Sequence, residues 1–377
     1  MGMGAQRLFE MVTSGQPGPG WLSPLRAAAI GASSLYGLAV WARNLGYDLQ
    51  LGQVRHLPAP VVGVGNLTVG GTGKTPLVMA VVRALTRLGL PSAVISRGYG
   101  GQAGQGGQAG QGVTWVSLGD GPLVDAAQSG DEPALLAQRL PVPVAAGPDR
   151  FNVGRAVLAR CGPRVLVGDD LFQHRHLHRD LDIVALDARA PLGNGLMLPA
   201  GPLREPASGL RRALAVVLTH ADNPEMARER RAWLRGFWGE GPVLACRHRQ
   251  LGLSDRDGRR LEPESWRGRP ALAFCGLARP EGFCQGLEDL GLKVLGLETF
   301  ADHHPYAPDE LERLWEKGRS LGAEALVTSE KDAVRLPPVL PPALKLWLTR
   351  LDLEFEKGPG DLEAVLAWGL SPWGREL

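Results

Sequence analysis

The chain has few cysteines, and their spacing excludes the common cysteine-based frameworks. Its 377 residues include four, none of which forms a CxxC pair: Cys161, Cys246, Cys275 and Cys284. A disulfide framework or a zinc site of the CxxC type is therefore not expected, and a reducing compartment fits.

An excess of positive charge is also missing. The 41 Lys and Arg residues nearly balance the 39 Asp and Glu residues, for a net charge of +2, and they form no basic tail or stripe. This balance argues against a nucleic-acid partner.

The first 20 residues lack the apolar core of a cleavable signal peptide and contain Gly and Pro, so no signal peptide is expected.

No apolar run is long enough to cross a bilayer directly. The longest candidate, residues 27–42, is uncharged, lies between Arg26 and Arg43, and falls short of the roughly 20 residues that a span needs. Two interpretations stay open: a membrane-surface helix or an ordinary buried helix. The aromatic residues suited to a lipid interface are Trp21, Tyr36 and Trp41.

Short apolar runs alternate with helical patterns along most of the chain. We expect strands at 61–64, 93–96, 164–167, 182–186, 214–218, 271–274, 293–295 and 325–327, and helices at 23–44, 76–88 and 308–321. This alternation predicts an α/β fold with a parallel sheet and helices on both faces. Residues 101–112 repeat the hexamer GQAGQG and are interpreted as a flexible insertion without an assigned function.

A glycine-rich loop stands between the first expected strand and the helix at 76–88. It consists of Thr68, Val69, Gly70, Gly71, Thr72, Gly73, Lys74 and Thr75. Such a loop directs backbone N–H groups at phosphates, while the lysine reaches the β- and γ-phosphates and the threonine hydroxyl binds Mg²⁺. Thr68 replaces the first Gly of the usual pattern, but the GxGKT portion is intact. The sequence predicts a nucleotide-phosphate site.

The expected strand at 164–167 leads to Asp169 and Asp170, which suits a Mg²⁺ ligand in a protein of this kind. A guanine-nucleotide switch is disfavoured. Neither aspartate is followed three positions later by Gly, and Ser329–Asp332 has the wrong spacing for a guanine-binding motif.

Two acidic turns are candidates for activating an acceptor hydroxyl. Asp131 and Glu132 precede Pro133, so they fit either proton transfer or a plain helix start. Asp302, His303 and His304 form an acid–imidazole cluster, for which helix capping by Asp302 is the alternative.

Two arginine-bearing loops complete the candidates. Arg97 is suited to bind an anionic group of the substrate, with Tyr99 stacking or hydrogen-bonding beside it. A Pro-anchored loop presents Arg204 and Glu205, unless it is only a domain linker. The alternating His174, His176 and His178 lack a partner spaced to complete a metal site, and we assign none.

Taken together, these motifs resemble the tetraacyldisaccharide 4′-kinase family of Gram-negative bacteria. The resemblance covers about residues 20–340. It rests on the segments 65–76, 96–100, 130–133, 169–174, 198–206, 302–306 and 328–336. One departure is Leu171, where the family has Gly. It costs little if the φ angle there is negative and more if it is positive.

The resemblance implies transfer of the γ-phosphate of ATP to the 4′-hydroxyl of a tetraacyldisaccharide 1-phosphate. It implies that Asp131 pairs with a histidine, assigned to His303 with His304 as the alternative. The implied nucleotide contacts include Lys74 and Gln173. The implied metal ligands are Thr75, Asp169, Asp170 and Glu205. The implied acceptor contacts are Arg97, Tyr99, Glu132, Arg150 and Arg204.

The same resemblance implies a place at the cytoplasmic face of the inner membrane, ATP and Mg²⁺ as cofactors, and a lipid A precursor as partner. It tips residues 27–42 toward membrane contact. We expect a monomer with an N-terminal membrane-associated segment (1–50), a phosphate-loop domain (51–205) and a smaller α/β domain with the Asp-His-His motif (206–377). The alternatives are a membrane-associated NTPase switch and a kinase of a soluble metabolite.

Overall fold

The chain folds into two compact units that alternate along the sequence. The computed structural model describes residues 5–13, 19–98, 112–256, 258–277, 279–341, 343–356 and 360–376. The first unit comprises Met1–Ser96, Asp149–Arg247 and Phe355–Leu377, and the second comprises Arg97–Pro148 and His248–Glu354. The boundary expected at 205/206 falls inside the first unit, because the chain leaves and re-enters each unit.

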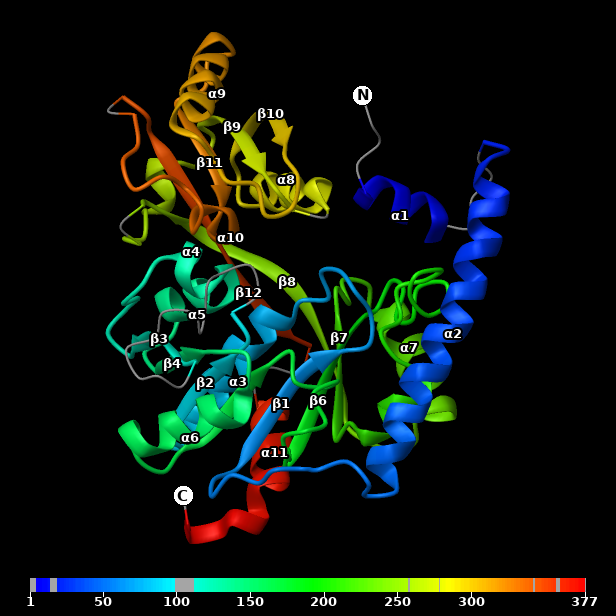
Figure 1. The fold of residues 1–377 in the computed structure, drawn as a ribbon. Helices are drawn as coiled ribbons and strands as arrows, with labels where there is room; N and C mark the ends of the chain where they lie inside the picture. The colour runs from blue at the N-terminus through cyan, green and yellow to red at the C-terminus, as the bar shows by residue number, and fades with distance from the viewer. Residues whose placement is uncertain are drawn as a thin grey trace. The chain divides into compact units, whose positions relative to one another are not determined.

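The first unit is built on a parallel sheet with the order β8-β7-β6-β1-β5-β2 (Figure 1). Its strands are β1 (Val61–Asn66), β2 (Ser92–Ser96), β5 (Val165–Asp169), β6 (Leu181–Asp187), β7 (Ala215–Thr219) and the start of β8 (Val243–Ser254). The first five are buried along their whole length, as expected for strands covered on both faces. The predicted parallel α/β sheet is confirmed.

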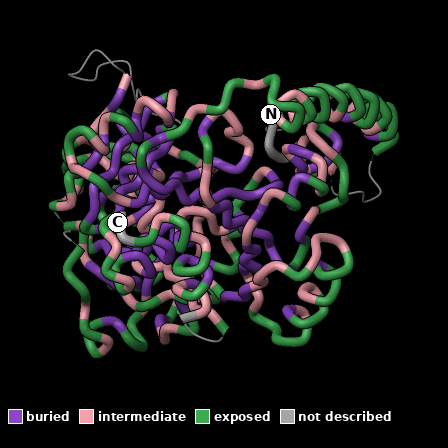
Figure 2. Tube along the Cα trace, turned by 90° about the horizontal axis from the view of Figure 1, so that it is seen from below, coloured by how far each residue is buried: buried purple, intermediate pink, exposed green. Residues whose placement is uncertain are grey.

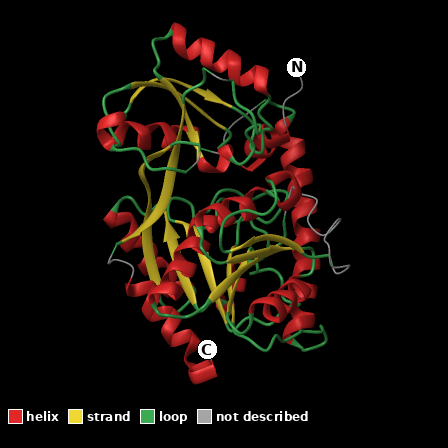
Figure 3. Ribbon diagram, turned by 90° about the vertical axis from the view of Figure 1, so that its left-hand side faces the viewer, coloured by secondary structure: helices red, strands yellow, loops and turns green. Residues whose placement is uncertain are grey.

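Helices flank these strands (Figure 3). They are α1 (Ala5–Thr13), α2 (Leu22–Asp48), α3 (Lys74–Arg87), α6 (Arg150–Cys161), α7 (Pro224–Phe237) and α11 (Gly360–Leu370), with short 3-10 turns at Ala207–Arg212 and Ser371–Glu376. Helix α3 packs against β1, β5 and β2, and also against α11. The phosphate loop therefore sits between the central strand and a helix that is anchored on several sides.

The second unit has a smaller parallel sheet, in the order β10-β9-β11-β12, and an antiparallel pair of strands, β3 and β4. Its strands are β3 (Thr114–Leu118), β4 (Pro143–Ala146), β9 (Pro270–Cys275), β10 (Lys293–Thr299), β11 (Ala325–Ser329) and β12 (Leu346–Phe355). Its helices are α4 (Ala126–Ser129), α5 (Asp131–Arg139), α8 (Pro280–Asp289), α9 (Pro308–Ser320) and α10 (Glu330–Ala333), with a 3-10 turn at Pro263–Ser265.

Alternate residues of β9 supply two separate hydrophobic clusters. Ala271, Ala273 and Cys275 belong to one, whereas Leu272 and Phe274 belong to the other. Because successive side chains of a strand point to opposite faces, the sheet of the second unit is also covered on both sides.

Helix α2 is longer and more exposed than an ordinary core helix. Residues 27–42 were expected to be too short for a span, but the helix that contains them has 27 residues and is long and apolar enough to cross a membrane by length and composition alone. Only 11% of its most apolar window is buried. Figure 2 shows exposed residues along most of this coil, beside the N-terminus. Leu35 and Leu38 are 72% and 60% exposed. The buried-helix interpretation of residues 27–42 is therefore wrong. The repeat at 101–112 lies outside the described residues except for Gly112.

Candidate active site

The phosphate loop has the strand–loop–helix geometry that its sequence predicts. Strand β1 ends at Asn66, and Gly73 lies in the left-handed region at φ +77° immediately before α3. The side-chain Nδ2 of Asn66 donates to the Thr68 carbonyl at 2.6 Å and to the Thr72 hydroxyl at 2.7 Å. A Cβ built on Gly70 or Gly71 would meet no atom within 4 Å. The Asn66 side chain thus fixes the loop, while Gly70 and Gly71 leave free space beside it, as the binding of a phosphate requires.

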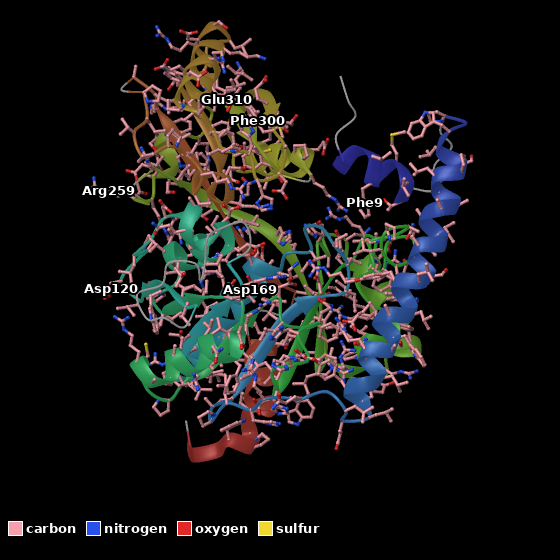
Figure 4. The ribbon with its side chains drawn as sticks, in the orientation of Figure 1. Phe9, Asp120, Asp169, Arg259, Phe300 and Glu310 are labelled. Carbon is pink, nitrogen blue, oxygen red and sulfur yellow. The ribbon has the colours of Figure 1, made fainter. Side chains whose placement is uncertain are left out.

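Acidic and basic side chains meet beside this loop. Asp169 ends β5 in register with Val64 of β1 and is buried (Figure 4). Asp170 accepts hydrogen bonds from Arg204 at 2.8 and 2.9 Å, and its Oδ1 lies 3.8 Å from Lys74 Nζ. Burial raises the pKa of Asp170, but the charges of Lys74 and Arg204 outweigh it and lower that pKa below its usual value.

Leu171 causes no backbone strain. Among the described residues near it, the positive φ falls on Asp170 at +54°, not on Leu171. The Leu171 side chain is fully buried and fills the space that a Cβ at Gly168 would need. Leu171 in place of the family glycine is therefore accommodated by packing.

Gln173 and Glu205 form a partly buried hydrogen-bond network that includes the end of β1. Gln173 Nε2 donates to the Asn66 carbonyl and to Glu205 Oε1, both at 2.8 Å. The other Glu205 oxygen accepts from Arg212 at 2.7 Å, and Glu205 is fully buried. In this arrangement Glu205 braces Gln173 against β1. Its assignment as a metal ligand stays a prediction.

The metal-binding capacity near the loop is modest. Within the described ranges, no three His, Cys, Asp or Glu side chains are grouped so that they could hold an ion by themselves. Mg²⁺ is commonly held by one or two carboxylates together with substrate phosphates and water. Thr75, at the start of α3, and Asp169, at the end of β5, fit that smaller requirement.

The second unit brings the two predicted acceptor motifs together. Asp131 begins α5, directly after Gly130, whose φ of +88° suits only glycine. His303 Nδ1 lies 2.8 Å from Asp131 Oδ2. Asp131 is nearly buried, with 11% of its side chain exposed, whereas the His303 side chain is 45% exposed. The pair thus has one sheltered and one accessible member.

His304 is engaged elsewhere. Its Nε2 lies 2.7 Å from Glu310 Oε2, and its ring packs against Phe300 and Tyr306. Figure 4 labels Glu310 and Phe300, which both belong to this second cluster. The geometry therefore favours His303 over His304 as the partner of Asp131.

Arg335 is a member of this cluster that the sequence analysis did not single out. Its Nε donates to Asp131 Oδ1 at 2.7 Å, and its guanidinium also contacts His303 Nδ1. Loss of solvation lowers the pKa of Arg335 to about 10, so it stays positively charged at neutral pH. The sequence offered one clue to Arg335, its position in the segment 328–336 that resembles the family. That segment does not indicate that Arg335 contacts Asp131, 204 positions away.

The pair opens onto a cavity of about 1060 Å³ within the second unit. The walls combine apolar side chains with charged ones, among them Asp131, His303, Arg335, Arg256 and Leu336. A polyol or sugar needs both kinds of surface, because its ring packs on apolar groups while its hydroxyls are hydrogen-bonded.

The remaining predicted substrate contacts differ in their placement. Arg97 is exposed at the start of the second unit, and Glu132 follows Asp131 in α5. Tyr99 lies outside the described residues. Arg150 is buried at the start of α6, close enough for its charge to lower the pKa of Asp170. It therefore faces the phosphate side rather than an exposed headgroup surface.

A phosphate loop on a parallel sheet, with acidic residues at the neighbouring strand end and an Asp–His pair, defines a P-loop phosphotransferase. The family model described as tetraacyldisaccharide-1-P 4′-kinase matches residues 25–369. The chain belongs to this family.

Individual relatives agree with the family match. The tetraacyldisaccharide 4′-kinase of Anaeromyxobacter dehalogenans is 44% identical, over 93% of this chain and 92% of its own. That of Geobacter metallireducens is 42% identical, over 81% and 87%. A crystal structure of LpxK from Aquifex aeolicus in complex with ATP superposes with a TM-score of 0.72 at 30% identity, over 92% of this chain and 99% of that one.

Proposed function

We propose that this protein transfers the γ-phosphate of ATP to the 4′-hydroxyl of a tetraacyldisaccharide 1-phosphate, a lipid A precursor. Family membership supports the activity. The observation that carries the mechanism is the 2.8 Å contact between Asp131 and His303, because phosphoryl transfer to an alcohol needs a group that accepts the hydroxyl proton.

The phosphate side is assigned to residues of the first unit. Lys74 and the N-terminus of α3 stabilise the negative charge of the transferring phosphoryl group. Thr75 and Asp169, with Asp170 and Glu205 as further candidates, would hold Mg²⁺, which would neutralise phosphate charge when bound. Arg204 fixes the orientation of Asp170. Residues 68–73 and Gln173 complete the nucleotide contacts.

The acceptor side is assigned to the cavity of the second unit. Asp131 and His303 take up the proton of the attacking hydroxyl. Arg97, Tyr99 and Glu132 remain proposed acceptor contacts, whereas Arg150 of the first unit is proposed as a contact of a substrate phosphate near Asp170. ATP binding thus needs only the first unit, whereas turnover needs both. Transfer to water would waste ATP, so we expect turnover only when both substrates are bound.

The exposed face of α2 supports a membrane-surface location. It presents several large apolar side chains to solvent, Ile30, Leu35, Leu38, Trp41 and Leu45, and the exposed Trp21 directly precedes the helix. A lipid acceptor and a cytosolic nucleotide are both within reach of a monomer that lies on the cytoplasmic face of the inner membrane.

The test is incubation of the full chain with ATP, Mg²⁺ and tetraacyldisaccharide 1-phosphate, read by mass spectrometry. We expect the lipid to gain one phosphate while ADP forms in equal amount. ADP formation with an unmodified lipid would instead indicate an NTPase switch, and transfer only to soluble sugars would indicate a metabolite kinase. Asp131→Asn, which leaves the phosphate loop intact, is the control for contaminating kinases.

A further inference from the structure

Both oxygens of Asp131 are occupied, and the Arg335 guanidinium contacts both of them. Oδ2 faces His303 Nδ1 at 2.8 Å, and Oδ1 accepts from Arg335 Nε at 2.7 Å. The Arg335 side chain is only 12% exposed, which strengthens its electrostatic effect relative to a surface pair. The cluster therefore has three members, with the carboxylate in the middle.

We propose that Arg335 is the positioning residue of the catalytic pair, which holds both oxygens of Asp131 and keeps that carboxylate ionised beside His303, so that His303 Nε2 acts as the proton acceptor. This inference rests on the proposed phosphoryl transfer. When His303 Nδ1–H donates to Asp131, the lone pair of the neutral ring lies on Nε2. That ring is the exposed member of the pair and lines the cavity.

The transfer then balances as follows. The hydroxyl oxygen of the acceptor forms a bond to the γ-phosphorus as its proton passes to His303 Nε2. The bond between the γ-phosphorus and the β–γ bridging oxygen breaks, and ADP leaves with that electron pair. His303 later releases the proton to water. Asp131 stabilises the transient imidazolium, while Arg335 opposes direct protonation of Asp131.

The backbone holds Arg335 where this role needs it. Arg335 follows α10, and its N–H donates to the Asp332 carbonyl at 3.0 Å. Helix α10 is capped by Ser329, which accepts from the N–H of Asp332. Glu330 of α10 forms an ion pair with Arg139 of α5. The helix that begins with Asp131 is thereby tied to the helix that delivers Arg335.

Removing the charge of Arg335 would leave the cluster short of positive charge. The other charged groups near the pair include Glu132 on α5, Asp302 beside His303 and Lys331 on α10, and Arg256 and Arg350 line the same cavity. Lys331 Nζ is committed to Asp302 at 2.7 Å, and Asp302 Oδ2 lies 3.7 Å from His303 Nε2. His304 is paired with Glu310. Without Arg335, protonation of the pair becomes easier.

The experiment is the pH dependence of kcat in Arg335→Met, Arg335→Gln and Arg335→Lys. We expect Met and Gln to lower kcat roughly 10- to 100-fold at neutral pH and to move the acidic limb upward by about one pH unit. The Lys variant keeps the charge, so it should keep the limb and recover part of kcat. The KM for ATP should stay unchanged. Arg256→Met, which removes another arginine of the same cavity wall, should keep the wild-type limb.

Two results would overturn the proposal. One is a uniform loss of kcat in the Met and Gln variants with an unmoved acidic limb, which indicates a structural role. The other is wild-type kcat in both. Melting temperatures distinguish a folding defect from a loss of catalysis. If Arg335→Met does not fold, the pH profiles of the Gln and Lys variants test the proposal. A wild-type enzyme that fails to phosphorylate the lipid at all would refute the proposed function instead, before the arginine variants are compared.

Discussion

The Nδ1 atom of His303 lies 2.8 Å from Oδ2 of Asp131, although 172 positions separate the two residues. If they act as one unit, Asp131→Asn and His303→Gln should each lower kcat by roughly 10²- to 10⁴-fold. The double variant should be little worse than either single one, because the second substitution removes nothing further. Turnover assays test this, with ATP affinity as the control. Losses that multiply would show that the two residues act independently.

His304→Gln should separate stability from catalysis. His304 binds Glu310 at 2.7 Å and packs on Phe300, so the substitution should cost about 1 kcal/mol of folding free energy. We expect kcat to stay within a few-fold of the wild type. Denaturant unfolding and turnover measure the two effects. A kcat loss as large as that of His303→Gln would return His304 to the catalytic pair.

Lys74→Met should impair the phosphate side alone. Lys74 begins α3, and its ammonium lies 3.8 Å from the Asp170 carboxylate. Its loss removes charge stabilisation of the transferring phosphoryl group and should lower kcat by roughly 10²- to 10³-fold. Lys317→Met, which breaks an exposed pair with Glu298, is the matched control. Equal activity of the two variants would contradict the assignment of Lys74.

His174 should make stability depend on pH. Burial, reinforced by the charges of Arg150 and Arg179, lowers its pKa in the folded chain to about 4, from 6.5. The unfolded chain therefore takes up a proton that the folded chain refuses. The contribution of neutral His174 to the free energy of unfolding is fully present above pH 6.5 and is lost as the pH falls toward 4. Melting temperatures at pH 7.5 and 5 should differ less in His174→Gln than in the wild type. Parallel curves for the two proteins would exclude this role.

The exposed face of α2 should bind lipid. Leu35→Glu with Leu38→Glu places two charges on side chains that are 72% and 60% exposed. Because burial of such side chains drives interfacial binding, we expect sedimentation with anionic vesicles to fall several-fold. Val339→Glu, at a residue that is 76% exposed in the second unit, is the matched control. Unchanged sedimentation of the α2 variant would show that this face does not bind the membrane.

Local patterns account for the part of the fold that the sequence predicts well. The strand from Val61, the glycine loop and the helix to Arg87 lie within one short stretch, so their order alone defines the phosphate cradle. Strands β8 and β12 escaped prediction because their middle residues alternate between partly buried and exposed, or are only partly buried. The antiparallel pair β3–β4 was also missed, and its strands are separated in the sequence by α4 and α5.

Long-range pairing accounts for what the sequence could not provide. Motif resemblance assigned His303 as the partner of Asp131 and left His304 as the alternative, and the contact of His304 with Glu310 now favours His303. Arg335 belongs to no motif that implies a carboxylate partner. Glu205 was expected at a metal, whereas its contacts with Gln173 and Arg212 depend on folding and have no local signature.

The attachment of α2 changes how truncation experiments must be interpreted. Tyr36 donates its hydroxyl proton to the Arg204 carbonyl at 2.9 Å, and Ser33 donates to the Met197 carbonyl at 2.8 Å. Arg204 in turn holds Asp170. A chain shortened past this helix would lose the brace of its own nucleotide loop together with any lipid contact. Inactivity of such a fragment would therefore say nothing about membranes, and only substitutions on the outer face of α2 can isolate that contribution.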